Sequence, residues 1–424
     1  MFQRIAPLAI IALVGCKDPI PNDTDDTDTE AVDRVSRVVV SADGPTAEVV
    51  AGHNRFAWDL YAELADDDDG NVFFSPFSTT SALGLTAAGA EGDTLDEMAA
   101  AMGIPADAAA WHAALGALTQ DLSGNLGRGY TLHIANRLFG QADYPFETSF
   151  LTLVDDAYDA PLEETDFIAD PESSRERVNT WVEDQTNDRI EDLLPQGSID
   201  TDTRLVLANA IYFLADWDAP FDPDMTSTGD FTTLSGDVVQ ADLMMMDTGS
   251  VQDAAIGFAH TDGLSIVSIP YEDRELSMVL LVPDAVDGLP AIEAQLDQAT
   301  FDGWVASTQV TDLTLIMPKF TFEYEAELSN PLKALGMTDL FDSTAADLTG
   351  IADPSDGNLF VSGVFHKAFV AVDELGTEAA AATAVVVGVE SAGAFVSADH
   401  AFAFVIRDDL TGTVLFVGRV SDPS

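Results

Sequence analysis

The feature of this sequence that most restricts its fold is a nearly continuous apolar run, TRLVLANAIYFLADW, from Thr203 to Trp217. Side chains in a β-strand alternate between the two faces of a sheet, and here apolar residues occupy both sets of positions. A strand of this kind needs other elements packed against both faces. The run therefore predicts a strand that is buried on both faces of a large sheet.

The rest of the chain combines helical and strand patterns. Apolar residues at helical spacing predict a first helix from about Pro45, and proline with acidic residues in the first turn predicts a long helix over Pro171–Leu194. Strand patterns dominate the second half, at residues 264–271, 276–283, 313–325, 364–374 and 400–420. This order predicts an α+β protein. Because no repeat and no second linker is evident, residues 45–424 are expected to form a single domain.

The charge balance excludes several classes of partner. The chain has 74 Asp and Glu residues against 17 Lys and Arg residues, which gives a net charge of −57. Nucleic acid is bound by neutralising its phosphates with Lys and Arg, so we expect no nucleic-acid partner. An anionic membrane surface is disfavoured for the same reason. The acidic surface is typical of a highly soluble protein, such as one from a saline habitat.

The amino terminus has the pattern of an export signal. Residues 1–16, MFQRIAPLAIIALVGC, combine a basic residue with an apolar run that is too short to span a bilayer. The last four, LVGC, resemble the bacterial lipobox, in which the cysteine is lipidated and becomes the first residue of the mature protein. Cys16 is the only cysteine in the chain, which favours lipidation over an ordinary signal peptide with an accidental cysteine.

Residues 17–44 are expected to form an acidic, disordered tether, because repulsion between carboxylates keeps such a segment extended. A metal site among its aspartates is the alternative, but no glycine turn or glutamate completes a calcium loop. We therefore expect a bacterial, exported protein whose only membrane contact is the lipid on Cys16. Its location would be the cell envelope, at the outer membrane or on the extracellular face.

Motifs that carry catalysis are missing from the sequence. There is no G-x-S-x-G elbow for a nucleophilic serine, no H-E-x-x-H for zinc and no glycine-rich loop for a nucleotide. The six histidines are scattered along the chain: His53, His112, His133, His260, His366 and His400. We therefore expect a protein that is not an enzyme and that uses no cofactor and no metal.

Several segments, in order, resemble the serpin family over roughly Pro45–Ser424. They are NVFFSPFSTTSALGLTAAGAEGDT, ANRLF, VNTWVEDQTNDRIEDLLPQGSIDTDTRLVLANAIYF, PYEDRELSMVLLVP, FEYEAELSNPLKALGMTDLF and FAFVIRDDLTGTVLFVGRVSDP. The resemblance implies the serpin fold, with three β-sheets, about nine helices and an exposed reactive loop at about residues 374–398. It also implies inhibition of endopeptidases, because serpin loops insert into a sheet as a new strand.

The segment ELGTEAAAAT is similar to the loop hinge of inhibitory serpins. If the loop becomes a strand, Thr377, Ala379 and Ala381 point to one face and begin with small side chains, so they can separate a pair of existing strands. Gly376 is expected to be the pivot, because glycine adopts backbone angles closed to other residues. The predicted hinge residues are Glu374, Gly376, Thr377, Ala379, Ala380, Ala381, Ala382 and Thr383.

The family spacing implies a scissile bond between Glu390 and Ser391. The target would then be a serine endopeptidase with a pocket for glutamate, such as a glutamyl endopeptidase, or a caspase-like cysteine endopeptidase. A shift by one residue would expose Val389 and imply an elastase-like or subtilisin-like target, and bonds at residues 392–395 are a further alternative. The protease would be trapped as an acyl-enzyme when the cleaved loop inserts.

Other positions match family residues that control opening of the sheet. Ser75, Ser78, Asn209 and His366 match a buried polar cluster, in which His366 could bridge strands by hydrogen bonds. Trp217 matches an aromatic residue at the end of the sheet where the hinge would enter. Lys319 matches a residue that would form an ion pair with Glu374. Loss of this ion pair should favour polymers of an otherwise monomeric protein. Leu214 and Ala215 replace the usual Lys-Gly pair, and the region after MGIPADAAAWHAAL, which ends at Leu115, is short and lacks basic residues, so no heparin-type activator is expected.

One competing hypothesis keeps the fold but not the activity. A non-inhibitory serpin could act as a surface binding or adhesion module and would be cleaved without trapping its protease. Such members usually carry bulky, charged or proline residues at the inward hinge positions, and this sequence has none there. The small hinge residues therefore favour inhibition.

Overall fold

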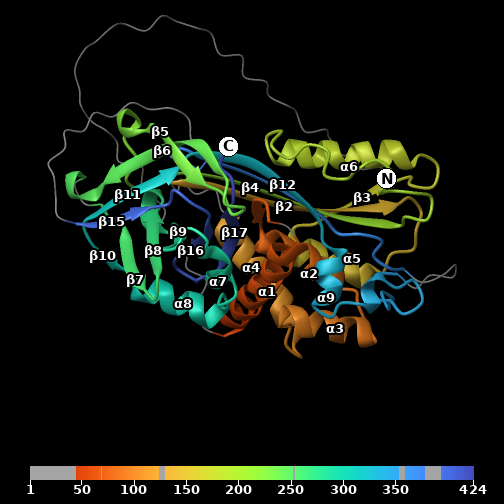
Figure 1. Ribbon diagram of the computed structural model, residues 1–424. Helices are drawn as coiled ribbons and strands as arrows, with labels where there is room; N and C mark the ends of the chain where they lie inside the picture. Colours follow the sequence, from red (N-terminus) through yellow and green to blue (C-terminus); the bar gives the residue numbers. More distant parts are fainter. Residues whose placement is uncertain (1–43, 68, 124–128, 252–253, 353–358, 378–392) are drawn as a thin grey trace, which may run out of the picture. The chain divides into compact units, whose positions relative to one another are not determined.

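The computed structural model describes residues 44–424 except 68, 124–128, 252–253, 353–358 and 378–392. Within these residues the chain forms nine α-helices and three β-sheets (Figure 1), which confirms the expected α+β fold. The predicted leader, the tether and Cys16 lie outside the described residues. Among the described helices, none is long and apolar enough to cross a membrane.

The helices lie mainly in the first half of the chain. They are α1 (Pro45–Asp67), α2 (Pro76–Ala87), α3 (Gly92–Met102), α4 (Ala108–Ser123), α5 (Thr148–Tyr158), α6 (Pro171–Gln185), α7 (Leu289–Glu293), α8 (Gln298–Ser307) and α9 (Ser329–Ala334). Helix α2 is buried along nearly its whole length, because its small residues let it pack closely beneath the sheet that carries the candidate site.

Helix α6 begins as the sequence predicts but ends earlier. Asp170 caps the first turn by accepting a hydrogen bond from the backbone N–H of Ser173. The helix stops at Gln185 rather than Leu194, because Asn187 and Asp188 adopt positive φ angles of 51° and 58°, which no α-helix contains. The prediction of a helix through Leu194 was therefore wrong over its last nine residues.

The described strands form three sheets. The six-stranded sheet has the order β12 (Phe320–Glu327), β13 (Phe365–Val372), β14 (Gly376–Thr377), β4 (Leu205–Asp216), β2 (Tyr130–Gln141), β3 (Leu162–Thr165). The seven-stranded sheet runs β1 (Val72–Phe74), β17 (Val414–Val420), β16 (Phe402–Asp408), β9 (Leu276–Pro283), β8 (Leu264–Pro270), β7 (Gly257–Thr261), β10 (Gln309–Val310). The four-stranded sheet runs β15 (Ala394–Ser397), β11 (Leu313–Pro318), β6 (Val238–Asp247), β5 (Ser227–Thr232).

Strand β4 corresponds to the long apolar run, but it is less buried than predicted. Leu205, Val206 and Leu207 are each only half-buried, and burial becomes more complete toward Ala215. The prediction of burial on both faces was wrong for this half of the strand. The physical reason is that the next full-length strand, β13, does not pair with β4 in the described sheet.

Candidate functional site

The candidate site is an opening in the six-stranded sheet between β4 and β13. Only the two-residue strand β14 joins these strands, through the pairs Val372↔Thr377, Thr377↔Ala215 and Gly376↔Asp216. The rest of β4, residues 205–214, and the rest of β13, residues 365–371, have no described strand between them. The sheet therefore has room for a further strand that would continue β14.

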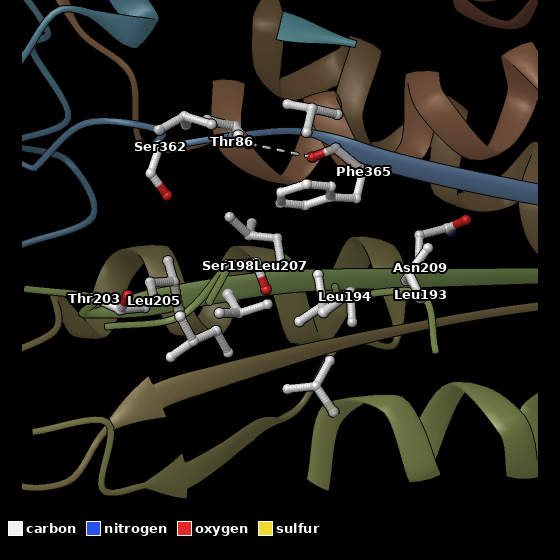
Figure 2. Close-up of a pocket in the computed structure, with 18 of the residues that line it drawn as sticks. Thr86, Leu193, Leu194, Ser198, Thr203, Leu205, Leu207, Asn209, Ser362 and Phe365 are labelled. Carbon is white, nitrogen blue, oxygen red and sulfur yellow. Dashed lines mark hydrogen bonds between the residues drawn. The ribbon is translucent and has the colours of Figure 1, made fainter. Parts of the chain in front are cut away.

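A cavity of about 650 Å³ fills this opening below β14. It is lined by β4, by residues 359–367, by the inner face of α2 and by the segment after α6. Figure 2 shows Leu205, Leu207 and Asn209 on one side and Phe365 on the other, with the Phe365 ring pointing from its strand toward Leu207. The lining combines apolar side chains, such as Leu205, Leu207 and Phe365, with polar ones that include Thr203 and Asn209. We call this space the sheet cavity.

Gly376 lies in β14, beyond the end of the sheet cavity, and its role differs from the one expected. Its φ is outside the left-handed region, so it is not a pivot that depends on special backbone angles in this structure. A Cβ at this position would lie 2.1 Å from the Ala215 carbonyl oxygen and 2.8 Å from the Asp216 Cα. Glycine is required because the two strands approach closely.

Thr377 points inward, as the alternation of side chains predicts. It is buried, and its hydroxyl is 2.7 Å from the hydroxyl of Tyr271. The Tyr271 ring stacks on Trp217 at 4.5 Å, and the Trp217 indole N–H donates to the Asp373 carbonyl oxygen at 3.1 Å. Burial raises the pKa of Tyr271, so this hydroxyl stays protonated. Tyr271, stacked on Trp217, thus supports the buried side chain of Thr377.

Glu374 is held just outside the sheet by several polar contacts. Its carboxylate is 2.7 Å from Lys319 Nζ and also accepts a hydrogen bond from the Thr226 hydroxyl at 2.7 Å. Its backbone carbonyl accepts from the Phe221 N–H at 2.8 Å. Burial alone would raise the pKa of Glu374, but the hydrogen bonds from Lys319 and Thr226 hold it below its usual range. The ion pair expected between Lys319 and Glu374 is therefore present.

Ser78, Asn209 and His366 line the sheet cavity, and hydrogen bonds join Ser75 to this cluster. The Ser78 hydroxyl donates to Asn209 Oδ1, and the Ser75 hydroxyl accepts from the Ser78 N–H. His366 Nε2 accepts from the Ser75 N–H at 3.2 Å. His366 therefore connects β13 to the start of α2 rather than directly to another strand, which corrects the expected bridge. Burial lowers the pKa of His366 to about 4, so the ring is neutral at pH 7.

Both ends of the expected loop at residues 374–398 are more ordered than an exposed loop. Gly376 and Thr377 are buried in β14, and residues 394–397 form β15 at the edge of the four-stranded sheet. The expected exposed boundaries were thus too wide at both ends. The remaining predicted hinge residues and the predicted scissile bond lie outside the described residues: Ala379, Ala380, Ala381, Ala382, Thr383, Val389, Glu390 and Ser391.

Sequence reasoning missed three contributors to the site. Tyr271 ends a predicted strand, which could have marked it as a residue at the rim of a sheet. Thr226 follows a short turn without a distinctive pattern, so no sequence signal identifies it. Asn136 on β2 accepts a hydrogen bond from the Asn209 amide at 2.7 Å and extends the polar cluster across the sheet. Among the residues that the structure describes, no group of acidic, histidine or cysteine side chains could hold a metal ion.

Comparison with known proteins gives one consistent result. Residues 51–423 match the model of the family described as "Serpin (serine protease inhibitor)". The chain is 37% identical to the leukocyte elastase inhibitor of Bos taurus over 391 residues, covering 89% of this chain and 100% of the relative. It is 40% identical to Serpin-ZXA of Oryza sativa subsp. japonica over 367 residues, covering 83% of this chain and 90% of that relative. The loop-inserted structure of a cleaved ovalbumin mutant has a TM-score of 0.79 and 27% identity, covering 88% of this chain and all of that one.

Proposed function

The chain belongs to the serpin family, and from this premise we propose that it inhibits serine endopeptidases as a suicide substrate. The observation that carries the proposal is the pairing of Gly376 and Thr377 between β4 and β13, directly above the sheet cavity. The first two hinge residues already occupy the strand position that the rest of the loop would fill. Relatives named as elastase inhibitors support the same activity.

The proposed reaction starts at the bond between Glu390 and Ser391. The hydroxyl of the protease serine attacks the Glu390 carbonyl carbon, the peptide C–N bond breaks, and the new amino group of Ser391 takes the proton. An ester now joins the protease to Glu390. Residues 378–389 then enter the sheet cavity as a strand and carry the protease with them before water hydrolyses the ester.

The energy available for insertion is large. About 12 inserted residues would each add backbone hydrogen bonds worth roughly 1 kcal/mol net. This sum is comparable with the total stability of a typical domain. The uncleaved protein is therefore metastable, and the contacts around Glu374, Trp217 and His366 are proposed to control how fast the sheet opens.

The proposed target is an endopeptidase that accepts glutamate, and a glutamyl endopeptidase is preferred over a cysteine endopeptidase. Cleavage after Val389 by an elastase-like enzyme is the second choice. The protein is proposed to act as a monomer without a polyanionic activator.

We further propose that lipidated Cys16 and the acidic tether hold the inhibitor at a bacterial cell envelope. Growth of expressing cells with a radioactive or clickable fatty acid tests this: the unmodified chain should be labelled, and the Cys16→Ser variant should not. Equal labelling of both would contradict the proposed anchor.

The inhibitory activity is tested by incubating the purified protein with a glutamyl endopeptidase and, separately, with an elastase. We expect a complex that survives denaturing electrophoresis and a released peptide that begins at Ser391. Cleavage without such a complex, and without a gain in heat resistance, would instead support the non-inhibitory binding module. A peptide that begins at Glu390, or beyond Ser391, would refute the assigned bond.

A further inference from the structure

The two most exposed large apolar side chains in the described residues are Val310 and Phe395. Val310 is 68% exposed at the edge of the seven-stranded sheet, and Phe395 is 65% exposed on the edge strand β15. A single exposed apolar residue needs no explanation, but two such residues on neighbouring segments can mark a contact surface.

These two side chains come from neighbouring segments. Phe395 pairs with Thr314 on β11, and the preceding residue, Ala394, donates its N–H to the Asp312 carbonyl oxygen at 2.9 Å. Val310 lies two residues before Asp312 on the same segment, and residues 309–312 are all exposed. Figure 1 shows β10 and β15 on the same side of the molecule. We call Phe395 and Val310 the loop-foot surface, because β15 follows directly on the reactive loop.

The chain length between the predicted cut and this surface is short. Phe395 is the fourth residue after Ser391, and four fully extended residues span at most roughly 14 Å. A globular endopeptidase of about 200 residues has a radius of gyration of roughly 17 Å, so it is on the order of 40 Å across. An endopeptidase whose active site holds the Glu390–Ser391 bond is therefore wide enough to reach β15.

The charge pattern also suits contact with a second protein. Charged residues make up 21% of the chain, so a 20-residue stretch holds about four on average. Residues 379–398 contain only one, Glu390. The later part of the loop and β15, residues 379–398, thus form a nearly uncharged stretch in a strongly acidic protein. Desolvating this stretch costs little, and aromatic residues at the centre of such a contact often dominate its binding energy.

We propose that the loop-foot surface is a docking site for the target endopeptidase, which contacts Phe395 and Val310 while the loop enters its active site. This inference rests on the proposed function and extends it. The loop supplies the scissile bond, and the loop-foot surface adds a contact that favours productive encounters. An endopeptidase with an apolar patch beside its leaving-group subsites would be inhibited fastest.

The test compares Phe395→Asp and Val310→Asp with Ile168→Asp as a matched control. Ile168 is also exposed, at 49%, but it lies between β3 and α6, which Figure 1 shows on the opposite side from β15. All three variants replace an exposed apolar side chain by a carboxylate, so they change the net charge equally. Thermal unfolding of each variant checks that the fold is intact.

The readout is kcat/KM for cleavage of the loop by whichever enzyme, the glutamyl endopeptidase or the elastase, cuts the unmodified protein. We expect each loop-foot variant to lower this value about tenfold and Ile168→Asp to change it less than twofold. The stoichiometry of inhibition should stay unchanged, because docking precedes the choice between trapping and hydrolysis. Values for both loop-foot variants within twofold of the control would overturn the proposal.

Two further measurements separate the possible explanations. A synthetic peptide of residues 385–398, with and without the Phe395→Asp change, should be cut at equal rates if Phe395 acts as a component of a folded surface. If the Phe395→Asp peptide is also cut more slowly and Val310→Asp has no effect, Phe395 binds directly in a subsite of the endopeptidase and the proposal is wrong. Absence of a covalent complex in every protein would refute the proposed inhibition, whereas a tenfold loss in kcat/KM would still support docking.

Discussion

The substitution Gly376→Ala should convert the inhibitor largely into a substrate. The added Cβ would lie 2.1 Å from the Ala215 carbonyl oxygen, so the two strands must move apart by about 1 Å. The backbone N–H of Trp217 donates a hydrogen bond to the Leu375 carbonyl oxygen at 2.7 Å, and this distance would exceed hydrogen-bonding range after such a shift. The Phe221 N–H to Glu374 bond and the contact between Thr377 and Tyr271 would weaken with it.

Three hydrogen bonds of roughly 1 kcal/mol each give a cost of about 3 kcal/mol for forming β14. If this cost enters the barrier to insertion, insertion slows roughly 100-fold. Hydrolysis of the acyl-enzyme then competes, because the rate of that chemical step is unchanged. The stoichiometry of inhibition should rise severalfold or more, while the rate of loop cleavage stays the same.

Titration of a fixed amount of protease with inhibitor measures this stoichiometry directly. The control is Gly303→Ala, because Gly303 lies in α8 and a Cβ there meets no atom within 4 Å. That variant should behave as the unmodified protein or be slightly more stable, since alanine favours a helix. A Gly376→Ala protein with unchanged stoichiometry would refute the argument that close approach of the strands requires glycine.

Three other changes probe the surroundings of the hinge. Lys319→Ala removes the partner of Glu374 and should speed polymer formation on heating, seen on native gels, while changing the unfolding free energy by less than about 1 kcal/mol because the pair is partly exposed. Tyr271→Phe should lower the unfolding free energy of the uncleaved protein by about 1 to 2 kcal/mol in urea, because the buried Thr377 hydroxyl loses its partner. His366→Gln should flatten the pH dependence of stability, measured by urea unfolding at pH 7 and pH 5.

The direction of the pH effect follows from the buried ring. The pKa of His366 is about 4 in the folded protein and near 6.5 when unfolded, so the unfolded state binds more protons between these values. Stability is full above about pH 6.5 and falls as the pH drops toward 4, by an amount on the order of 3 kcal/mol for this residue. His53 and His112, whose pKa burial also lowers to about 4, add to the same fall. An unchanged slope in His366→Gln would contradict this origin.

Much of the fold could be predicted because local pattern and family resemblance agree. The strands at 276–283 and 400–420 and the start of α6 at Pro171 appear where the sequence places them. The end of α6 could not be predicted, since the turn at Asn187 and Asp188 depends on left-handed angles that a propensity argument does not foresee.

The site was harder to predict than the fold. The pair of Lys319 and Glu374 came from the resemblance, whereas the role of Gly376 depends on the distance between two backbones. Partial burial of β4 depends on which strand lies beside it, a long-range fact that no local pattern contains. The same holds for His366, whose partner, Ser75, is 291 residues away in sequence.

The most direct test of loop insertion is amide hydrogen exchange before and after the loop is cleaved. Our account predicts that amides of residues 205–214 and 365–371, on the two strands that flank the sheet cavity, exchange much more slowly after cleavage, and that the melting temperature rises. Unchanged exchange along both strands after complete cleavage would contradict the central claim that the loop inserts between β4 and β13.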